Sequence, residues 1–374
     1  MEKWKIIAIV ITVSVAVLLI AAYFVTISYR RKHEKIRISD ACQSSATDTI
    51  FVMMASYKNP YAAAETLTSL FENAHCPLRV YAGVFELYDP ASSTNILDEY
   101  EMQTKFSKSP FCLRDHVRTI RIPVNENKGI LAAHEQIERF LYRGEKFVAS
   151  ILPGMEVTPS WDKYCIDVLR GAAVSTKHTK NILTAMSAGD VPVLTSDPGT
   201  YVGLHDDGSL LGYRMKHKST VPFVPALGWS SEFSFSDAVR IHDTPYERYP
   251  DEYPNGFDTV LHDMYMTIRL LKNGWETLHP TGALVYNRRR NFDASDHNGS
   301  MAWRDRMQAV NRARGTGKIF SKLGVVSIGD NKMGLSARAR LGLTPKADDT
   351  EIIGKVGSIG EYLSILSRLD LKNK

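Results

Sequence analysis

The sequence predicts an α/β fold with a central, mainly parallel sheet, preceded by one N-terminal transmembrane helix. From residue 49 onward, short β-rich apolar runs alternate with stretches whose apolar residues recur at helical spacing, which is typical of parallel strands joined by helices. Residues 6–27 form a run without a charged side chain, long enough to cross a hydrocarbon core of about 30 Å. The composition of the 374 residues, 44% hydrophobic and 23% charged, excludes disordered, collagen-like and disulfide-scaffold classes.

The formal net charge of +5 lies at the N-terminus. The first 38 residues hold seven basic and two acidic side chains, so that the remaining chain carries equal numbers of each. A neutral body lacks the basic surface that nucleic-acid binding requires. We therefore expect no nucleic-acid partner.

The apolar run is predicted to be a retained anchor in membrane lipid. Trp4, Tyr23 and Tyr29 lie near its ends, where amphipathic rings favour the membrane interface. The alternative is a cleaved signal peptide, whose apolar region spans roughly 7–15 residues before a small-residue site. This run is longer, and bulky Tyr23 follows Ala21 and Ala22. The predicted organisation is a tail (1–5), an anchor (6–27), a basic flank and stem (28–48) and a folded body (49–371).

The elements of the first half follow in regular order. Strands are predicted at 49–55, 78–87, 117–122, 146–152 and 181–186, and helices at 61–75, 128–142 and 159–169. In a parallel sheet the ligand lies beyond the carboxyl ends of the strands. The loops at 56–59, 87–89 and 152–156 are therefore the predicted ligand loops.

The second half is less regular. Residues 190–221 are rich in Gly, Asp, Pro and Ser, and we expect a long excursion on the acceptor side. A helix is predicted at 259–273, with Gly274 as its C-terminal cap, and a closing strand at 283–286. Trp229 and Trp275 are interpreted as core residues.

Three blocks of the chain resemble a family of glycosyltransferases. The first block comprises residues 50–60 with Thr66, Leu67, Leu70 and Phe71. The second comprises Gly129, residues 141–145, Met155, Trp161 and Asp162. The third comprises Pro245, Tyr246, Asp263, Arg269, Gly274, Trp275, Pro280, Val285 and Tyr286. Residues 357–370 are similar to the closing segment of that family. Together the blocks resemble the GlcNAc-type glycosyltransferases that include the enzyme modifying hydroxyproline on a cytoplasmic ubiquitin-ligase subunit.

The resemblance implies a GT-A-like nucleotide-diphospho-sugar transferase domain over 49–371. Its parts would be a donor-side half (49–186), an acceptor-side half (187–300) and a C-terminal segment (301–371). The implied activity is transfer of a sugar, GlcNAc, from a UDP-sugar to a hydroxyl group of a protein or glycan. The acceptor itself cannot be read from the chain.

The residues that would hold a divalent cation differ from the family pattern. Such enzymes hold Mn²⁺ or Mg²⁺ with oxygen ligands and an imidazole, in an Asp-Ser-His motif before a Met and a later His. The matching positions here are Leu152, Gly154 and Asn287. Leu and Gly offer no side-chain ligand, so the sequence predicts no metal site.

Other site residues follow from the resemblance and from strand ends. Asp263 is the candidate general base, with His262 beside it where the family has an acidic residue. His134 stands where the family has an Arg. The donor-binding candidates are Ser56, Tyr57, Lys58, Glu86, Gly129, Arg288 and Arg289. The two arginines would neutralise the leaving diphosphate, and a solvated turn is the alternative interpretation of their basic run.

Two questions stay open at this level. The chain is either an active transferase with a rearranged site, or a pseudo-enzyme that binds a partner without turnover; a structural membrane protein is a third hypothesis. The basic flank after the anchor favours a cytoplasmic body, whereas most membrane-anchored sugar transferases place the body in the lumen. Cys42, Cys76, Cys112 and Cys165 are either thiols or two bridges.

Overall fold

The computed structural model describes residue 42 and residues 47–91, 94–106, 113–126, 128–187, 200–204, 210–214, 221–226, 228–246 and 259–287. Within these ranges no helix is both long and apolar enough to cross a membrane. The predicted anchor at 6–27, the basic run at 288–290 and the predicted C-terminal segment lie outside them.

The described residues contain an eight-stranded, mostly parallel sheet. Its strands lie in the order β3 (Val117–Pro123), β2 (Val80–Tyr88), β1 (Ile50–Tyr57), β4 (Phe147–Ile151), β10 (Phe233–Asp237), β6 (Asn181–Ala185), β11 (Glu276–Pro280) and β9 (Phe223–Pro225). The first four strands are mutually parallel, as are β6 and β11. β10 runs antiparallel between β4 and β6, and β9 is antiparallel to β11. The predicted α/β class is confirmed.

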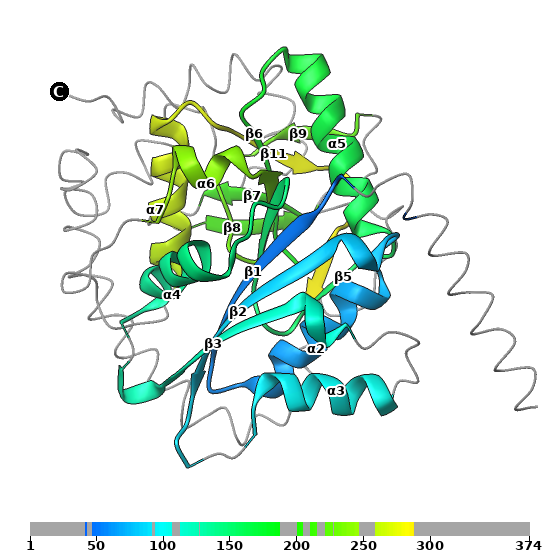
Figure 1. Cartoon of the computed structure of the whole chain (residues 1–374). Coiled ribbons are helices and arrows are strands. Elements are labelled where there is room, and N and C mark those ends of the chain that lie inside the picture. The colour runs from blue at the N-terminus through cyan, green and yellow to red at the C-terminus, as the bar shows by residue number, and fades with distance from the viewer. Residues whose placement is uncertain are drawn as a thin grey trace, which may run out of the picture.

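Helices cover both faces of the sheet (Figure 1). One face carries α2 (Pro60–Glu72), α3 (Ile96–Phe106) and α5 (Trp161–Thr176), and the other carries α4 (Ile130–Gln136), the π-turn η4 (Ile137–Leu141), α6 (Val239–Asp243) and α7 (Thr259–Lys272). Short 3-10 turns occupy η1 (Pro77–Arg79), η2 (Arg114–His116) and η3 (Val124–Glu126). Each face has its own apolar core, because successive strand residues point to opposite sides.

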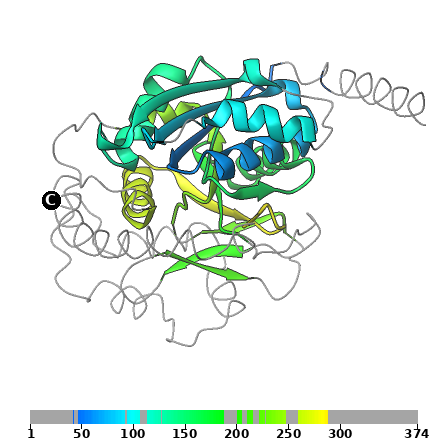
Figure 2. The same ribbon diagram turned by 90° about the horizontal axis from the view of Figure 1, so that it is seen from below.

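Two small two-stranded sheets complete the described fold. β5 (Met155–Val157) pairs with β12 (Val285–Asn287), and β7 (Thr200–Leu204) pairs with β8 (Leu210–Arg214), both antiparallel. Figure 2 shows the β7–β8 pair on one side of the main sheet, where it contacts β6, β11 and α7. The predicted excursion at 190–221 therefore contains two strands, which the turn-rich composition concealed.

Most predicted elements are confirmed within one or two residues, including the helix at 259–273. Gly274 has φ +74°, and the following amide of Trp275 donates to the carbonyl of Leu270 at 2.9 Å, as expected for a glycine C-cap. Trp229 and Trp275 are buried core residues. The prediction missed α3, β5, β9, β10, β11 and α6.

The cysteines resolve into one bridge and one thiol in the described chain. Cys42 and Cys76 form a disulfide, and Cys165 is a buried free cysteine. Cys112 lies outside the described residues. Of the two open alternatives, thiols or two bridges, neither describes the other three cysteines: two form one bridge and Cys165 is a thiol.

A glycine in β2 tests how closely the sheet packs. A Cβ added to Gly83 would lie 2.3 Å from Cζ of the Phe51 ring, which is fully buried. We expect Gly83→Ala to lower the free energy of unfolding by about 1–3 kcal/mol, because the ring must move within a packed core. Gly171→Ala is the matched control, since nothing lies within 4 Å of its Cβ position in α5. Urea denaturation should show the control unchanged or slightly stabilised; equal midpoints for the two variants would contradict the packing argument.

Candidate functional site

The carboxyl ends of the parallel strands meet at one edge of the sheet. β1 ends at Tyr57 beside Leu87 of β2, and β4 ends at Ile151 beside the start of β10. The amide of Leu152 lies 3.5 Å from the carbonyl oxygen of Glu232. The three predicted ligand loops therefore follow neighbouring strands. We call this region the carboxyl edge, and it is the position at which open α/β sheets bind ligands.

The turn after β1 is fixed by its own hydrogen bonds. Ser56 Oγ donates to the carbonyl of Asn59 at 3.1 Å, and the amide of Lys58 donates to the carbonyl of Leu87 at 2.8 Å. The side chain of Asn59 accepts the amide of Ala62 at 3.0 Å, which caps α2. Lys58 has φ +51°, a left-handed conformation that is uncommon for a residue with a side chain and that recurs at functional sites.

The three donor-binding candidates of this turn, Ser56, Tyr57 and Lys58, differ in how exposed their side chains are. Ser56 is fully buried, and its hydroxyl is used within the turn. Tyr57 packs against the core on the α4 side. Lys58 is partly exposed and lies 3.4 Å from a carboxylate oxygen of Asp89. Lys58 therefore brings an accessible positive charge to the carboxyl edge.

Glu86 lies near the end of β2 on the opposite face from Phe85. It is buried, and Arg121 Nε lies 3.2 Å from its Oε2. Burial raises the pKa of the Glu86 carboxyl, while the Arg121 guanidinium acts in the opposite direction. Its Oε1 makes no hydrogen bond of ordinary geometry within the described chain. The backbone amide of Ile96 also acts on this carboxylate, and the donor-binding role of Glu86 stays a prediction.

A cavity of about 330 Å³ lies beyond the ends of β2 and β3. It is lined by Phe85, Ile122, Glu126, Lys128, Gly129, Ala132, Ala133 and Gln136. Gly129 has φ +90° and precedes α4, so the chain turns sharply there with no side chain to narrow the cavity. Lys128 is exposed at its border. The structure thus places the predicted residue Gly129 in a cavity that is apolar on one side and charged on the other.

The three residues at the predicted cation-ligand positions lie near one another. In the β5–β12 pair, Met155 lies opposite Asn287, which brings the loop of Leu152 and Gly154 beside Asn287. The side chains of these three residues offer a single amide oxygen, that of Asn287. The nearby carboxylate of Glu156 accepts a hydrogen bond from the Tyr286 hydroxyl.

These residues do not fit a divalent cation, which prefers several carboxylate or carbonyl oxygens. No group of three His, Cys, Asp or Glu side chains in the described ranges is arranged to hold a metal. The backbone at Gly154 is also held in a fixed turn against α2. Gly154 has φ +83°, and its amide donates to Thr66 Oγ1 at 2.8 Å.

Asp263, the candidate general base, is a buried residue of α7. Its Oδ1 accepts the amide of Ser231 at 2.7 Å, and its backbone carbonyl accepts the hydroxyl of Thr267. With 7% of its surface exposed, Asp263 holds the segment that leads into β10. The structure therefore places Asp263 behind the carboxyl edge, tied to the backbone that forms it.

Glu232 is a site residue that the sequence did not reveal. It is half-buried at the start of β10, and its Oε2 accepts the amide of Ser187 at 2.6 Å. Its own amide donates to Ser230 Oγ at 3.2 Å. Glu232 reaches the carboxyl edge because β10 is inserted antiparallel beside β4. No motif marks it, and the alternation of Phe and Ser in residues 233–236 was the one available signal.

Two departures from the family pattern contact each other beneath the site. The rings of His134 and His262 lie 4.6 Å apart, and the Tyr246 hydroxyl lies 2.6 Å from His262 Nε2. Burial lowers the pKa of His134 to about 3, with Arg240 acting in the same direction. Burial also lowers the pKa of His262 well below its usual range. Both imidazoles are therefore neutral core groups at pH 7.

Arg288 and Arg289 lie outside the described residues, so their predicted contact with a diphosphate stays a prediction.

Comparisons with known proteins identify similar sequences and folds. A family model described as glycosyltransferase (GlcNAc) matches residues 49–105 and 89–314. No curated protein matches the chain.

Among solved structures, the chain is similar to S. aureus TarS 1–349 in complex with UDP-GlcNAc, with 13% sequence identity. The match covers 85% of this chain and 90% of that chain, with a TM-score of 0.41. It is also similar to the mannosyltransferase PcManGT from Pyrobaculum calidifontis in complex with GDP-Man and Mn²⁺, with 10% identity, coverage of 86% and 85%, and a TM-score of 0.42.

Proposed function

The chain belongs to the glycosyltransferase (GlcNAc) family, and on this premise we propose that it transfers GlcNAc from UDP-GlcNAc to a hydroxyl group of a protein or glycan. The observation that supports this proposal is the cavity of about 330 Å³ at the carboxyl edge, bordered by Gly129. A pocket with one apolar side and a few polar side chains at the other suits a nucleoside. The diphosphate would then lie near the exposed lysines of the adjoining strand ends.

Within this proposal the nucleoside occupies the cavity and the diphosphate lies toward the turn after β1. Lys128 borders the cavity and Lys58 is exposed in that turn. Ammonium groups bind phosphate as point charges. The backbone of Ser56 and Tyr57 would contact the base and ribose, and Arg288 and Arg289 would add to the phosphate contacts. Glu86 lies on the opposite face of β2 from Phe85, so its carboxylate would not contact a nucleoside in this cavity.

We propose that donor binding needs no divalent cation. Leu152, Gly154 and Asn287 occupy the places of the family's ligands, and their side chains offer one amide oxygen between them. Lysine and arginine side chains would then stabilise the leaving diphosphate, as preorganised charges do at other phosphoryl sites.

Two carboxylates are candidates for the general base. Asp263 is the residue that the family match selects, and Glu232 is the more exposed carboxylate at the carboxyl edge. A general base must come within hydrogen-bond reach of the acceptor hydroxyl. Comparing Asp263→Asn with Glu232→Gln in a transfer assay separates the two roles.

Donor binding is the direct test. We expect the purified full-length chain to bind UDP and UDP-GlcNAc in isothermal calorimetry, equally with and without Mn²⁺. Lys128→Ala should weaken UDP binding about 10–100-fold, because it removes one charge-assisted hydrogen bond. Lys163→Ala is the matched control, since Lys163 is exposed on α5 and pairs with Asp167. Absence of UDP binding under either condition would exclude the transferase proposal, and binding strengthened by Mn²⁺ would exclude the metal-free site.

The alternative function is binding without turnover. The observation that favours it is the loss of all three cation-ligand positions together. If the chain binds UDP-GlcNAc but neither hydrolyses nor transfers it, the pseudo-enzyme is the correct description. Turnover that Glu232→Gln or Asp263→Asn abolishes would exclude it.

Residues 6–27 are proposed to anchor the protein in membrane lipid. Their length without a charge supports this proposal. Extraction with alkaline carbonate should leave the full-length chain in the membrane pellet, whereas release into the supernatant would contradict an anchor.

A further inference from the structure

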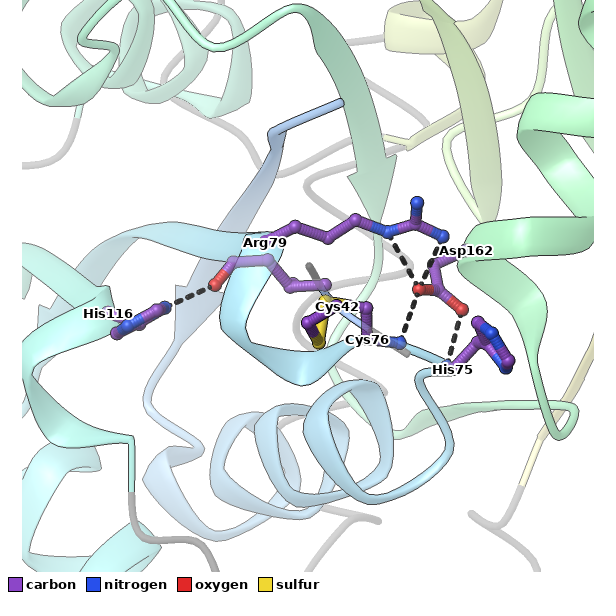
Figure 3. The surroundings of a disulfide bond; sticks show 7 residues. Cys42, His75, Cys76, Arg79, His116 and Asp162 are labelled. Atoms are coloured by element: carbon purple, nitrogen blue, oxygen red, sulfur yellow. Dashed lines mark hydrogen bonds and ion pairs between the residues drawn. A yellow bond between two sulfur atoms is a disulfide. The ribbon is translucent and has the colours of Figure 1, made fainter. Parts of the chain in front are cut away.

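A disulfide joins the segment before β1 to the folded body. Cys42 and Cys76 are bonded across a sequence separation of 34 residues, and both are buried. Cys42 belongs to the predicted stem, whereas Cys76 lies between α2 and β2 (Figure 3). The bond therefore fastens the stem to the domain.

The position of Cys76 is set by the body itself. The carboxylate of Asp162 accepts the amides of His75 at 2.6 Å and Cys76 at 3.0 Å. The same carboxylate accepts hydrogen bonds from Nε and Nη2 of Arg79, at 2.9 and 2.7 Å. Figure 3 shows these donors converging on Asp162 from the turn that carries Cys76. These hydrogen bonds within the folded body therefore fix the position of Cys76, which bonds to Cys42.

A second contact holds the same N-terminal segment. Asp48 forms ion pairs with Lys146 at 2.9 Å and Arg170 at 2.8 Å. The carbonyl of Thr49 accepts the amide of Phe147 at 2.9 Å. Asp48 and Thr49 are therefore attached to the body close to the start of β1.

The remaining described cysteine does not compete for the bond. Cys165 is fully buried in α5. Burial raises the pKa of its thiol well above the usual range, and the nearby carboxylate of Asp162 acts in the same direction. Since the thiolate is the species that attacks a disulfide, Cys165 stays a thiol beside the bridge.

We propose that the body folds in an oxidising compartment, on the extracytoplasmic side of the membrane, where the Cys42–Cys76 bond fixes the stem to the domain. Structural disulfides form and persist in such compartments and are rare in the cytosol. In forming the bond, the two thiols lose two protons and two electrons. A disulfide of the thiol-oxidoreductase class accepts both through a mixed-disulfide intermediate and becomes a dithiol. This inference goes beyond the proposed transfer reaction and does not depend on it.

The proposed orientation opposes the one that the flanking charges favour. The basic residues at 30–37 would then lie outside the cytoplasm, against the positive-inside tendency. With an anchor ending at residue 27, the 14 residues 28–41 reach at most about 50 Å when fully extended. The bond at Cys42 thus holds the body near the membrane surface.

The state of the cysteines is the first test. The full-length chain, expressed in eukaryotic cells, is treated with N-ethylmaleimide before lysis, digested without reduction and examined by mass spectrometry. We expect a linked peptide pair containing Cys42 and Cys76, with Cys165 alkylated after denaturation alone. Cys165→Ala should retain the linked pair, whereas Cys42→Ser should leave Cys76 as a thiol. Alkylated Cys42 and Cys76 in the wild type would overturn the proposal.

Protease treatment of sealed microsomes is the second test. We expect the body to resist digestion until detergent opens the vesicles, and Asn298→Gln to remove any N-linked glycan at the Asn298-Gly-Ser sequon. Digestion of the body in intact vesicles overturns the extracytoplasmic assignment even if the bond forms during purification. UDP binding by the purified chain is measured separately, so that failure of the proposed function and failure of this inference give different results.

Discussion

Replacing Asp162 with alanine is expected to lower the free energy of unfolding by about 3–5 kcal/mol, as measured for broken buried ion pairs. The variant leaves the guanidinium of Arg79, 5% exposed, without its partner carboxylate. It also leaves the amides of His75 and Cys76 without their acceptor. An unpaired buried charge and two unpaired donors each carry a desolvation cost.

Urea denaturation of the full-length chain measures this loss. Asp167→Ala is the matched control, because Asp167 lies on the same helix, is about half exposed and pairs with exposed Lys163. An exposed pair contributes at most about 1 kcal/mol. The double variant Arg79→Met, Asp162→Leu should be less destabilised than Asp162→Ala, since it buries no lone charge. A loss in Asp162→Ala no larger than in Asp167→Ala would show that the network does not stabilise the fold.

Acidification below pH 6.5 is expected to destabilise the fold steeply. His134, His262 and His279 are fully buried, and burial lowers the pKa of each, to about 3 for His134 and His279. The unfolded chain binds protons on these histidines below about pH 6.5, whereas the folded chain does not, so stability falls as the pH falls. Each group contributes at most about 1.4 kcal/mol per pH unit. Since the unfolded histidine is half protonated at pH 6.5, His134 and His279 together contribute about 3 kcal/mol between pH 6.5 and 5.

Buried carboxyls act in the opposite direction. Burial raises the pKa of Glu138, although Arg240 lies against it. A carboxyl whose pKa is higher in the folded state stabilises the fold as the pH falls. The net loss of folding stability is therefore smaller than the sum over the histidines. Urea midpoints at pH 7, 6 and 5 measure the balance. We expect the midpoint to fall, and the fall to be smaller in His279→Gln; the same pH dependence in His279→Gln and the wild type would contradict neutral burial of this imidazole.

The sequence predicted the elements that carry a strong local pattern. The strands β1 and β4 are continuous apolar runs, and α2 begins at Pro60 after a capping Asn59. The helix α3 was missed because its sequence is mixed polar and apolar, although Asn95, whose Oδ1 accepts the amide of Asp98 at 2.9 Å, caps its start. The strand β10 was missed because its neighbours, β4 and β6, are far away in the chain. The alternation of Phe and Ser at 233–236 was its one local signal.

The candidate site was predictable to the same extent. The loops at strand ends could be located, because parallel strands end at one edge, and the family pattern marked Leu152, Gly154 and Asn287 as one group. The register of β5 and β12 confirms that the last of these lies beside the first two. Glu232 was not predictable, since its place at the edge depends on the antiparallel insertion of β10.

The turn at Gly154 makes the loss of the cation ligand difficult to reverse. A histidine introduced there would have to adopt φ +83°, or the loop would have to release the hydrogen bonds that its amide makes to Ala62 and Thr66 of α2. The left-handed conformation costs a residue with a side chain about 1–2 kcal/mol. An imidazole at this position would therefore not by itself create a cation site, because the turn that carries it is held to α2.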